Sequence, residues 1–197
     1  MNAAHLQKTL RASQYAEQVL RLHREILEHD YAVDQFQSSL STEQIQQWVH
    51  TELLGIQDET DWMRSLRVLR ARLMFRWIWQ DANVLTDVVT LTRELSDFAD
   101  ASINAAKDFA RIPLLAKHGE PIGVSGHVQD LIVVAMGKLG AQELNLSSDI
   151  DLIFAFDEQG ETNGRKCVDV QQFCIAWGQK IIYLLEHITA DGFIFRV

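Results

Sequence analysis

The sequence predicts an α+β fold, in which a helical N-terminal region over residues 1–112 precedes a small core of strands and helices over residues 113–197. Three observations support this division. Apolar residues recur at helical spacing through the first half of the chain. The only prolines, Pro113 and Pro121, come after that half. Two short apolar runs then follow, each with the length and the boundaries of a strand.

We expect four helices in the N-terminal region, over about residues 2–28, 42–54, 59–80 and 87–111. The second begins after Ser41, which can form a capping box with Gln44 three residues later. The third carries five arginines beside its apolar stripe, at positions 64, 67, 70, 72 and 76. Such a run is usually a solvated face that pairs with acidic groups. The alternative is a basic groove facing an acidic partner or a phosphate.

Residues 111–129 contain both prolines and several glycines, and we expect a loop there that bridges the two regions. The apolar runs 131–136 and 152–156 are predicted strands. Because neither run alternates with polar residues, we expect buried strands, the second covered on both faces as in the centre of a sheet. A helix over about residues 168–187 and a third strand over residues 192–197 complete the expected core.

Composition excludes several classes of protein. A net charge of −9 argues against a nucleic-acid backbone as the main ligand, because such ligands require a basic face. The longest apolar run is far shorter than the roughly 20 residues that a membrane-spanning helix needs. Cys167 and Cys174 lack metal-site spacing, so we expect reduced thiols and a cytoplasmic protein.

The chemistry is expected at Asp149 and Asp151, at the start of the second predicted strand. Side chains two apart on a strand share a face, so two carboxylates can converge on the same divalent cation. Two unpaired like charges beside an apolar strand are unfavourable for folding alone, and a bound cation would remove that cost. By itself, an Asp-x-Asp pair is common and is more often structural than catalytic.

The turn before this pair adds groups that suit a phosphate. Gly137 and Gly140 give conformational freedom and accessible backbone amides, and Lys138 adds a positive charge. The spacing is not that of a P-loop. Ser147 and Ser148 could also contact phosphate oxygens, or they could be plain turn residues.

The combination of strand, glycine turn, short connector, Asp-Ile-Asp and second strand resembles the nucleotidyltransferase superfamily of DNA polymerase beta. Residues 136–140, 143–145 and 147–154 are further similar to the signature of the bacterial glutamine synthetase adenylyltransferase family, with alanine where that family usually has glycine at positions 135 and 141. The similarity continues through residues 189–197 and covers most of the chain from about residue 58.

This resemblance implies an incomplete polymerase beta-like core that controls glutamine synthetase by adenylylation and deadenylylation. It implies Mg²⁺ or Mn²⁺ at Asp149 and Asp151, phosphate and ADP, or ATP, as nucleotide-site substrates, and the PII signalling protein as a second partner. The order of elements resembles the family's N-terminal copy, which removes adenylyl groups by phosphorolysis. In the family an aspartate follows the counterpart of Val197 as a third metal ligand, so we expect a truncated piece of a longer enzyme.

Two alternatives remain open at this stage. One is a nucleotidyltransferase that acts on another substrate. The other is a non-catalytic, truncated module that binds glutamine synthetase or PII.

Overall fold

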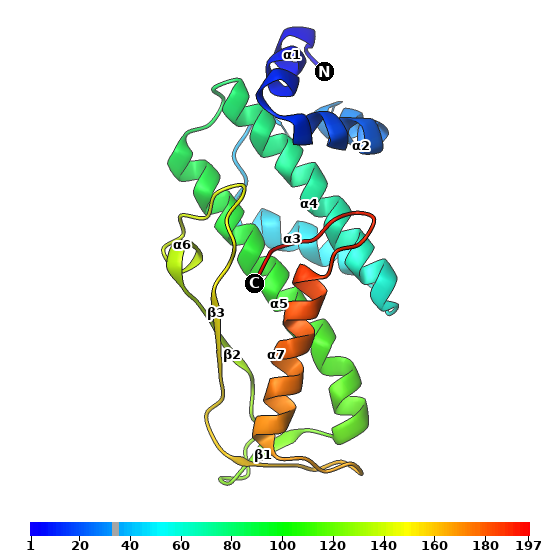
Figure 1. Cartoon of the computed structure of the whole chain (residues 1–197), viewed down its shortest axis with the longest axis vertical. Coiled ribbons are helices and arrows are strands. Elements are labelled where there is room, and N and C mark those ends of the chain that lie inside the picture. The colour runs from blue at the N-terminus through cyan, green and yellow to red at the C-terminus, as the bar shows by residue number, and fades with distance from the viewer. Residues whose placement is uncertain (33–35) are drawn as a thin grey trace. The chain divides into compact units, whose positions relative to one another are not determined.

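The computed structural model describes residues 1–32 and 36–197, and these form helices together with a few short antiparallel strands, in agreement with the predicted α+β class (Figure 1). The chain divides into two compact units. Their bounds are residues 1–98 with 142–147, and residues 99–141 with 148–197. These units divide inside a helix, whereas the sequence placed a domain boundary at 112/113. That domain assignment stays a prediction.

The first unit is a set of helices packed around one central helix. The helices that begin in it are α1 (Ala3–Ala12), α2 (Gln14–Ala32), α3 (Thr42–Leu53), α4 (Glu59–Ala82) and α5 (Val88–His118). Because α1, α2 and α3 all contact α4, that helix is buried around most of its circumference, with Trp62, Leu66 and Trp77 almost fully inaccessible. An aromatic cluster that includes Phe36, Phe75 and Trp79 fills one side of this core.

The helix ends follow local sequence signals. The single helix expected over residues 2–28 is two helices, which part at Ser13, and the Ser13 hydroxyl accepts a hydrogen bond from the Ala16 amide. The predicted capping box is confirmed. The Ser41 hydroxyl accepts from the Gln44 amide, and the Gln44 side chain accepts from the Ser41 amide at 2.9 Å.

The arginines of α4 do not form a solvated face, and the expectation of either such a face or a basic groove is wrong for four of the five. Only Arg64 is exposed. Arg67 is buried and donates to the Met63 carbonyl oxygen at 2.9 Å, and Arg70 donates to the Tyr15 hydroxyl at 3.2 Å. The other two reach carboxylates on neighbouring segments. These side chains therefore tie the surrounding elements to the central helix.

The most buried of these contacts centres on Glu94 of α5. Arg76 Nη1 lies 2.6 Å from Glu94 Oε2, and the Trp77 indole N–H donates to the same oxygen at 2.8 Å. The other carboxylate oxygen accepts from the Leu40 amide at 2.8 Å. Arg76 and Glu94 expose only 2% and 1% of their side chains. Burial lowers the pKa of Arg76, and the Glu94 carboxylate opposes that shift.

Helix α5 continues through Pro113, so the loop expected from residue 111 is wrong over its first part. The helix ends instead at Gly119, whose amide donates to the Leu115 carbonyl oxygen at 2.9 Å. Gly119 has a φ of +76°, the left-handed conformation in which glycine commonly ends a helix. A proline inside a helix removes one backbone hydrogen bond and crowds the carbonyl oxygen four residues earlier, at a cost of about 3 kcal/mol, so α5 continues past Pro113 against this local cost.

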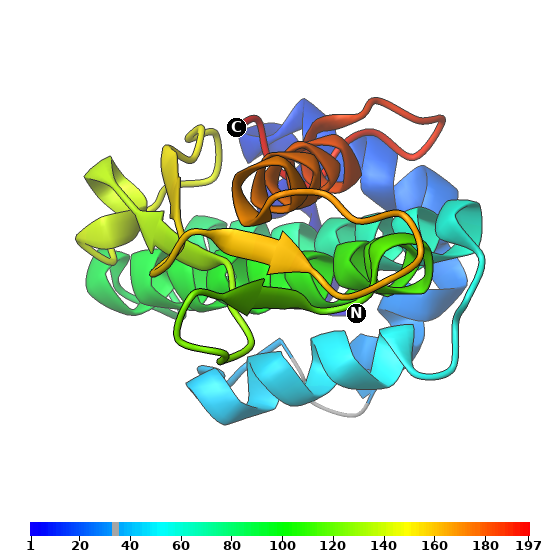
Figure 2. The same ribbon diagram turned by 90° about the horizontal axis from the view of Figure 1, so that it is seen from below.

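The second unit holds two separate antiparallel pairs of strands. One pairs β1 (Pro121–Gly123) with β4 (Gly160–Thr162), and the other pairs β2 (Ile132–Ala135) with β3 (Leu152–Ala155). Helix α7 (Val170–Glu186) lies beside β1, β3 and β4 (Figures 1 and 2). Gly178 of α7 faces the Phe154 ring so closely that a Cβ there would lie 3.4 Å from it.

The β2–β3 hairpin is not buried, and the expectation of strands buried in a sheet centre is wrong. Ile132, Val134 and Ile153 expose 48%, 43% and 51% of their surface. In the observed register Val134 faces Ile153 across the ladder, so these residues share one open face. Phe154 and its opposite, Val133, lie on the other face, where α7 packs.

The predicted third strand over residues 192–197 is also not observed. Within the described residues this stretch forms only an isolated bridge between Thr189 and Gly192. It is held instead by the end of α7, because the amides of Ile194 and Phe195 both donate to the Leu185 carbonyl oxygen. Among the helices that the structure describes, none combines the length and the apolar character needed to cross a membrane.

Candidate functional site

The two predicted carboxylates lie at the end of the β2–β3 hairpin. The Asp151 carbonyl oxygen accepts from the Met136 amide at 2.8 Å, so the ladder extends by one residue beyond the end of β2 and before the start of β3. Asp149 and Asp151 are exposed, whereas Ile150 between them exposes only 1% of its surface. The buried Ile150 thus separates two carboxylates that are both open to solvent.

The glycine turn forms α6, a single helical turn over Gly137–Gly140 that follows β2 directly. Gly137 has a φ of +55°, and a Cβ there would lie 3.3 Å from Asp151 Oδ2. At Gly140 a Cβ would lie 2.6 Å from the Ala135 carbonyl oxygen, which is too close for any side chain. The glycines thus let the turn fold tightly against the strand end and leave Asp151 room.

Lys138 and Ser148 are brought together by this turn, with Lys138 Nζ 3.4 Å from Ser148 Oγ. Ser147 belongs to the other compact unit, in the 142–147 stretch, and its amide donates to the Asn145 side-chain oxygen at 3.2 Å. The contact of Ser147 is that of a turn residue. A phosphate-binding role for either serine stays a prediction.

Sequence reasoning missed Arg196 as a site residue. Its Nε lies 2.6 Å from Asp149 Oδ1, and the two side chains expose 57% and 59% of their surface. The Arg196 carbonyl oxygen also accepts from the Ile150 amide at 2.9 Å. The family resemblance covered the Phe195-Arg196-Val197 stretch. However, the distance in sequence between Arg196 and Asp149 gives no sign that the two residues are in contact.

The site offers two carboxylates to a hydrated divalent cation. Mg²⁺ is commonly bound through one or two carboxylates while it keeps several waters, and Asp149 and Asp151 supply that donor set. The described part of the chain contains no cluster of three or more His, Cys, Asp or Glu side chains that could hold a metal. Arg196 already engages one of the two carboxylates.

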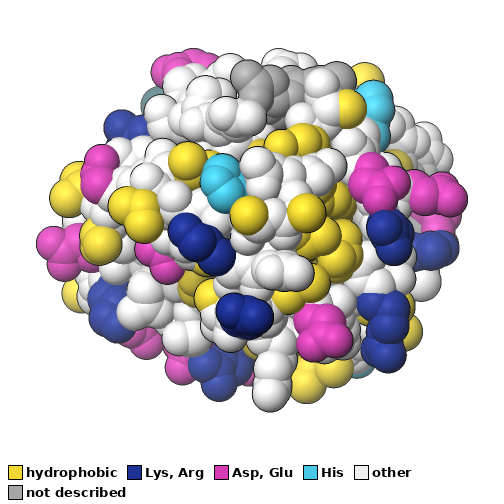
Figure 3. All heavy atoms as spheres, turned by 90° about the horizontal axis from the view of Figure 1, so that it is seen from above, with side chains coloured by type: hydrophobic (Ala, Val, Ile, Leu, Met, Phe, Trp, Pro, Cys, Tyr) yellow, Lys and Arg dark blue, Asp and Glu magenta, His cyan; other side chains and the backbone are white. Residues whose placement is uncertain are grey.

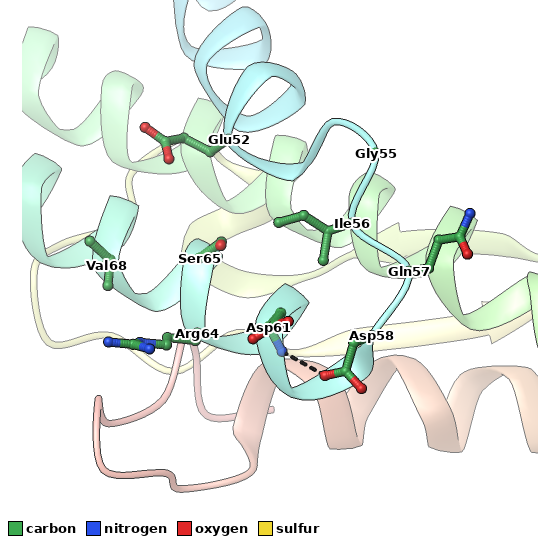
Figure 4. A pocket seen from close by; sticks show the side chains of 9 residues that line it. All are labelled: Glu52, Gly55, Ile56, Gln57, Asp58, Asp61, Arg64, Ser65 and Val68. Carbon is green, nitrogen blue, oxygen red and sulfur yellow. Dashed lines mark hydrogen bonds between the residues drawn. The ribbon is translucent and has the colours of Figure 1, made fainter.

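A pocket in the first unit is lined by other residues than those of the glycine turn and the acidic pair. It has a volume of about 540 Å³ and lies between the end of α3 and the start of α4 (Figure 4). Its wall includes Asp58, which caps α4 by accepting from the Asp61 amide at 3.0 Å, and the exposed Arg64. On the face drawn in Figure 3, basic and acidic side chains are interspersed, not gathered into a field of one sign.

The comparisons with known proteins define the class. A model of the glutamate–ammonia ligase adenylyltransferase family matches residues 3–197, and the chain belongs to this family. It is 75% identical, over its whole length, to the bifunctional glutamine synthetase adenylyltransferase/adenylyl-removing enzyme of Acinetobacter baylyi, of which it covers 21%. The enzyme of the same name from Hahella chejuensis is 48% identical over 74% of the chain and 15% of that relative. The chain therefore matches only about a fifth or less of the length of these relatives.

Proposed function

We propose that this chain is part of the adenylyl-removing half of an enzyme that controls glutamine synthetase, and that its second unit is built on a polymerase beta-like nucleotidyltransferase core. The observation that carries the proposal is the exposed pair Asp149 and Asp151, which flanks the buried Ile150 beside the Gly137–Gly140 turn. Family membership supports the same chemistry. The helical region before the motif resembles the family's deadenylylating copy and favours that direction.

The proposed reaction is phosphorolysis of a tyrosine-linked AMP. A phosphate oxygen attacks the adenylyl phosphorus, the bond from phosphorus to the tyrosine oxygen breaks, and the products are ADP and the free tyrosine. The opposite, adenylylating activity would use ATP. Mg²⁺ or Mn²⁺ bound by Asp149 and Asp151 would offset the negative charge that gathers on the transferred group.

The chain's own groups would bind and orient the phosphate. Lys138 supplies a positive charge in the glycine turn, and its ammonium group lies 3.4 Å from the hydroxyl oxygen of Ser148, the residue before Asp149. Gly137 and Gly140 leave no side chain between the turn and an approaching phosphate oxygen. Ser147 would act in the connector as a turn residue or as a further donor.

The proposed partners are glutamine synthetase, which the relatives' names contain, and the PII signalling protein, which only the family resemblance implies. Nucleic acid is not proposed as a ligand, because the net charge is −9, and a membrane is not proposed, because the longest apolar run is far too short to span one. We also propose a cytoplasmic location, where the free thiols of Cys167 and Cys174 would stay reduced.

The test is ADP release from adenylylated glutamine synthetase in the presence of phosphate and Mg²⁺. It is run on this chain and on the Acinetobacter relative, each with Asp149→Asn or its equivalent. We expect the substitution to lower the rate at least about 100-fold, as loss of a group that stabilises transition-state charge does. Asp157→Asn, which removes an equally exposed carboxylate just after β3, is the matched control and should leave the rate unchanged. Full activity of Asp149→Asn in the relative would exclude the site.

A non-catalytic module that binds glutamine synthetase or PII is the second candidate. The observation that favours it is the Asp149–Arg196 ion pair, which neutralises one of the two carboxylates without a metal. In that case the chain would bind glutamine synthetase with the same affinity whether or not Asp149 and Asp151 are both replaced by asparagine.

A further inference from the structure

The backbone of Arg196 is held from two sides. Before it, the amides of Ile194 and Phe195 donate to the Leu185 carbonyl oxygen at 2.8 and 3.2 Å. The carbonyl oxygen of Arg196 itself accepts from the Ile150 amide at 2.9 Å. Ile194, Phe195 and Ile150 expose 0%, 6% and 1% of their surface. The arginine is therefore placed beside the acidic pair by buried neighbours, and its position does not depend on its own exposed side chain.

The guanidinium of Arg196 contacts Oδ1 of Asp149, one of the two oxygens that a cation could use. Arg196 Nε lies 2.6 Å from Asp149 Oδ1, the short distance of a charge-assisted hydrogen bond. A divalent cation at the same carboxylate would meet this positive charge at close range, and like charges at such a distance repel even in water. Both side chains are more than half exposed, so the pair is weak enough for a cation to displace.

We propose that Arg196 is a positioning residue that competes with the divalent cation for Asp149. When no cation is bound, Arg196 neutralises the Asp149 carboxylate and holds it in place. Cation binding requires the guanidinium to leave Oδ1 while the backbone of Arg196 stays fixed. The inference rests on the metal-binding role proposed above for Asp149 and Asp151, and it adds a built-in competitor that sets how tightly the site binds metal.

The experiment is a titration of the 197-residue chain with Mn²⁺, with the free ion measured by electron paramagnetic resonance. We expect Arg196→Gln to lower the Mn²⁺ dissociation constant about fivefold, which corresponds to the weak energy of an exposed ion pair. Arg196→Lys keeps the positive charge and should stay within about twofold of the unaltered chain. Arg165→Gln removes the same charge from an exposed arginine between β4 and α7, and it should change the constant less than twofold.

Unchanged or weaker Mn²⁺ binding by Arg196→Gln would overturn the inference, and so would an equal effect of Arg165→Gln, which would indicate net charge alone. Asp149→Asn and Asp151→Asn separate this failure from failure of the proposed function. If neither aspartate variant reduces Mn²⁺ binding, the metal site is excluded, and the proposed competition between Arg196 and the cation is excluded as well. If both reduce it while Arg196→Gln has no effect, the metal site stands and only the role of Arg196 is wrong.

Discussion

The two compact units each contain an arginine–carboxylate pair with the same 2.6 Å separation, but in opposite surroundings. Arg76–Glu94 in the first unit is almost fully buried, whereas Arg196–Asp149 in the second is more than half exposed. Breaking a buried pair leaves an uncompensated charge and costs several kcal/mol, while an exposed pair contributes about 0–1 kcal/mol. Distance alone therefore does not show what an ion pair does. The buried one fixes the helices, and the exposed one can exchange its partner.

The largest effect on stability is expected at Glu94. Glu94→Gln would leave Arg76 buried without its counter-charge, and we expect the free energy of unfolding to fall by about 3–5 kcal/mol. Urea denaturation followed by circular dichroism measures this loss. The double variant Arg76→Met with Glu94→Leu should lose less than the sum of the single changes, because no buried charge remains. A loss below about 1 kcal/mol for Glu94→Gln would remove the contrast between the two pairs.

An intermediate effect is expected at Arg72, whose Nε and Nη2 both donate to Asp30 at 3.0 Å and which also pairs with Glu52. Its side chain is 16% exposed and that of Asp30 is 6% exposed, between the two extremes. Arg72→Met should lower the free energy of unfolding by about 2 kcal/mol, since it removes hydrogen bonds to a mostly buried carboxylate. Arg64→Met, an exposed arginine on the same helix, is the control in the same urea titration. Equal losses of unfolding free energy in Arg72→Met and Arg64→Met would show that the contribution of an arginine to stability does not depend on its burial.

The smallest effect is expected at the candidate site. Arg196→Gln should change the free energy of unfolding by less than about 1 kcal/mol, because solvent screens the pair. The small difference should vanish in 1 M KCl, where the Debye length is about 3 Å. Thermal unfolding at low and high salt measures both points. A salt-independent loss comparable to that of Glu94→Gln would place Arg196 among the structural arginines.

Local signals in the sequence were the reliable ones. The capping box of Ser41 and Gln44 depends on residues three apart, and it is present as predicted. The acidic pair and its glycine turn also lie close together in sequence, and the structure places Gly137 against Asp151, where a Cβ would lie 3.3 Å from Oδ2. Whether those residues bind metal or phosphate stays a prediction.

Features that depend on distant partners could not be predicted in the same way. The partners of Arg72 and Arg76 lie on other helices, so periodicity alone suggested a solvated face. An apolar run does not reveal how many of its faces are covered, which is why β2 and β3 were expected to be buried. Pro113 was given too much weight as a helix breaker, although Gly119 carries the conformation that ends α5.

The short stretch 142–147 has a consequence for dissecting the chain. It is grouped with the first unit although it lies between two segments of the second. Leu144 in this stretch is fully buried, and its amide donates to the Ser96 hydroxyl at 3.2 Å. A fragment that ends at residue 98 would lose the buried Leu144 side chain and expose the apolar surface that Leu144 covers. The two units are therefore interleaved in sequence, and a single cut of the gene cannot separate them without leaving the helical part incomplete.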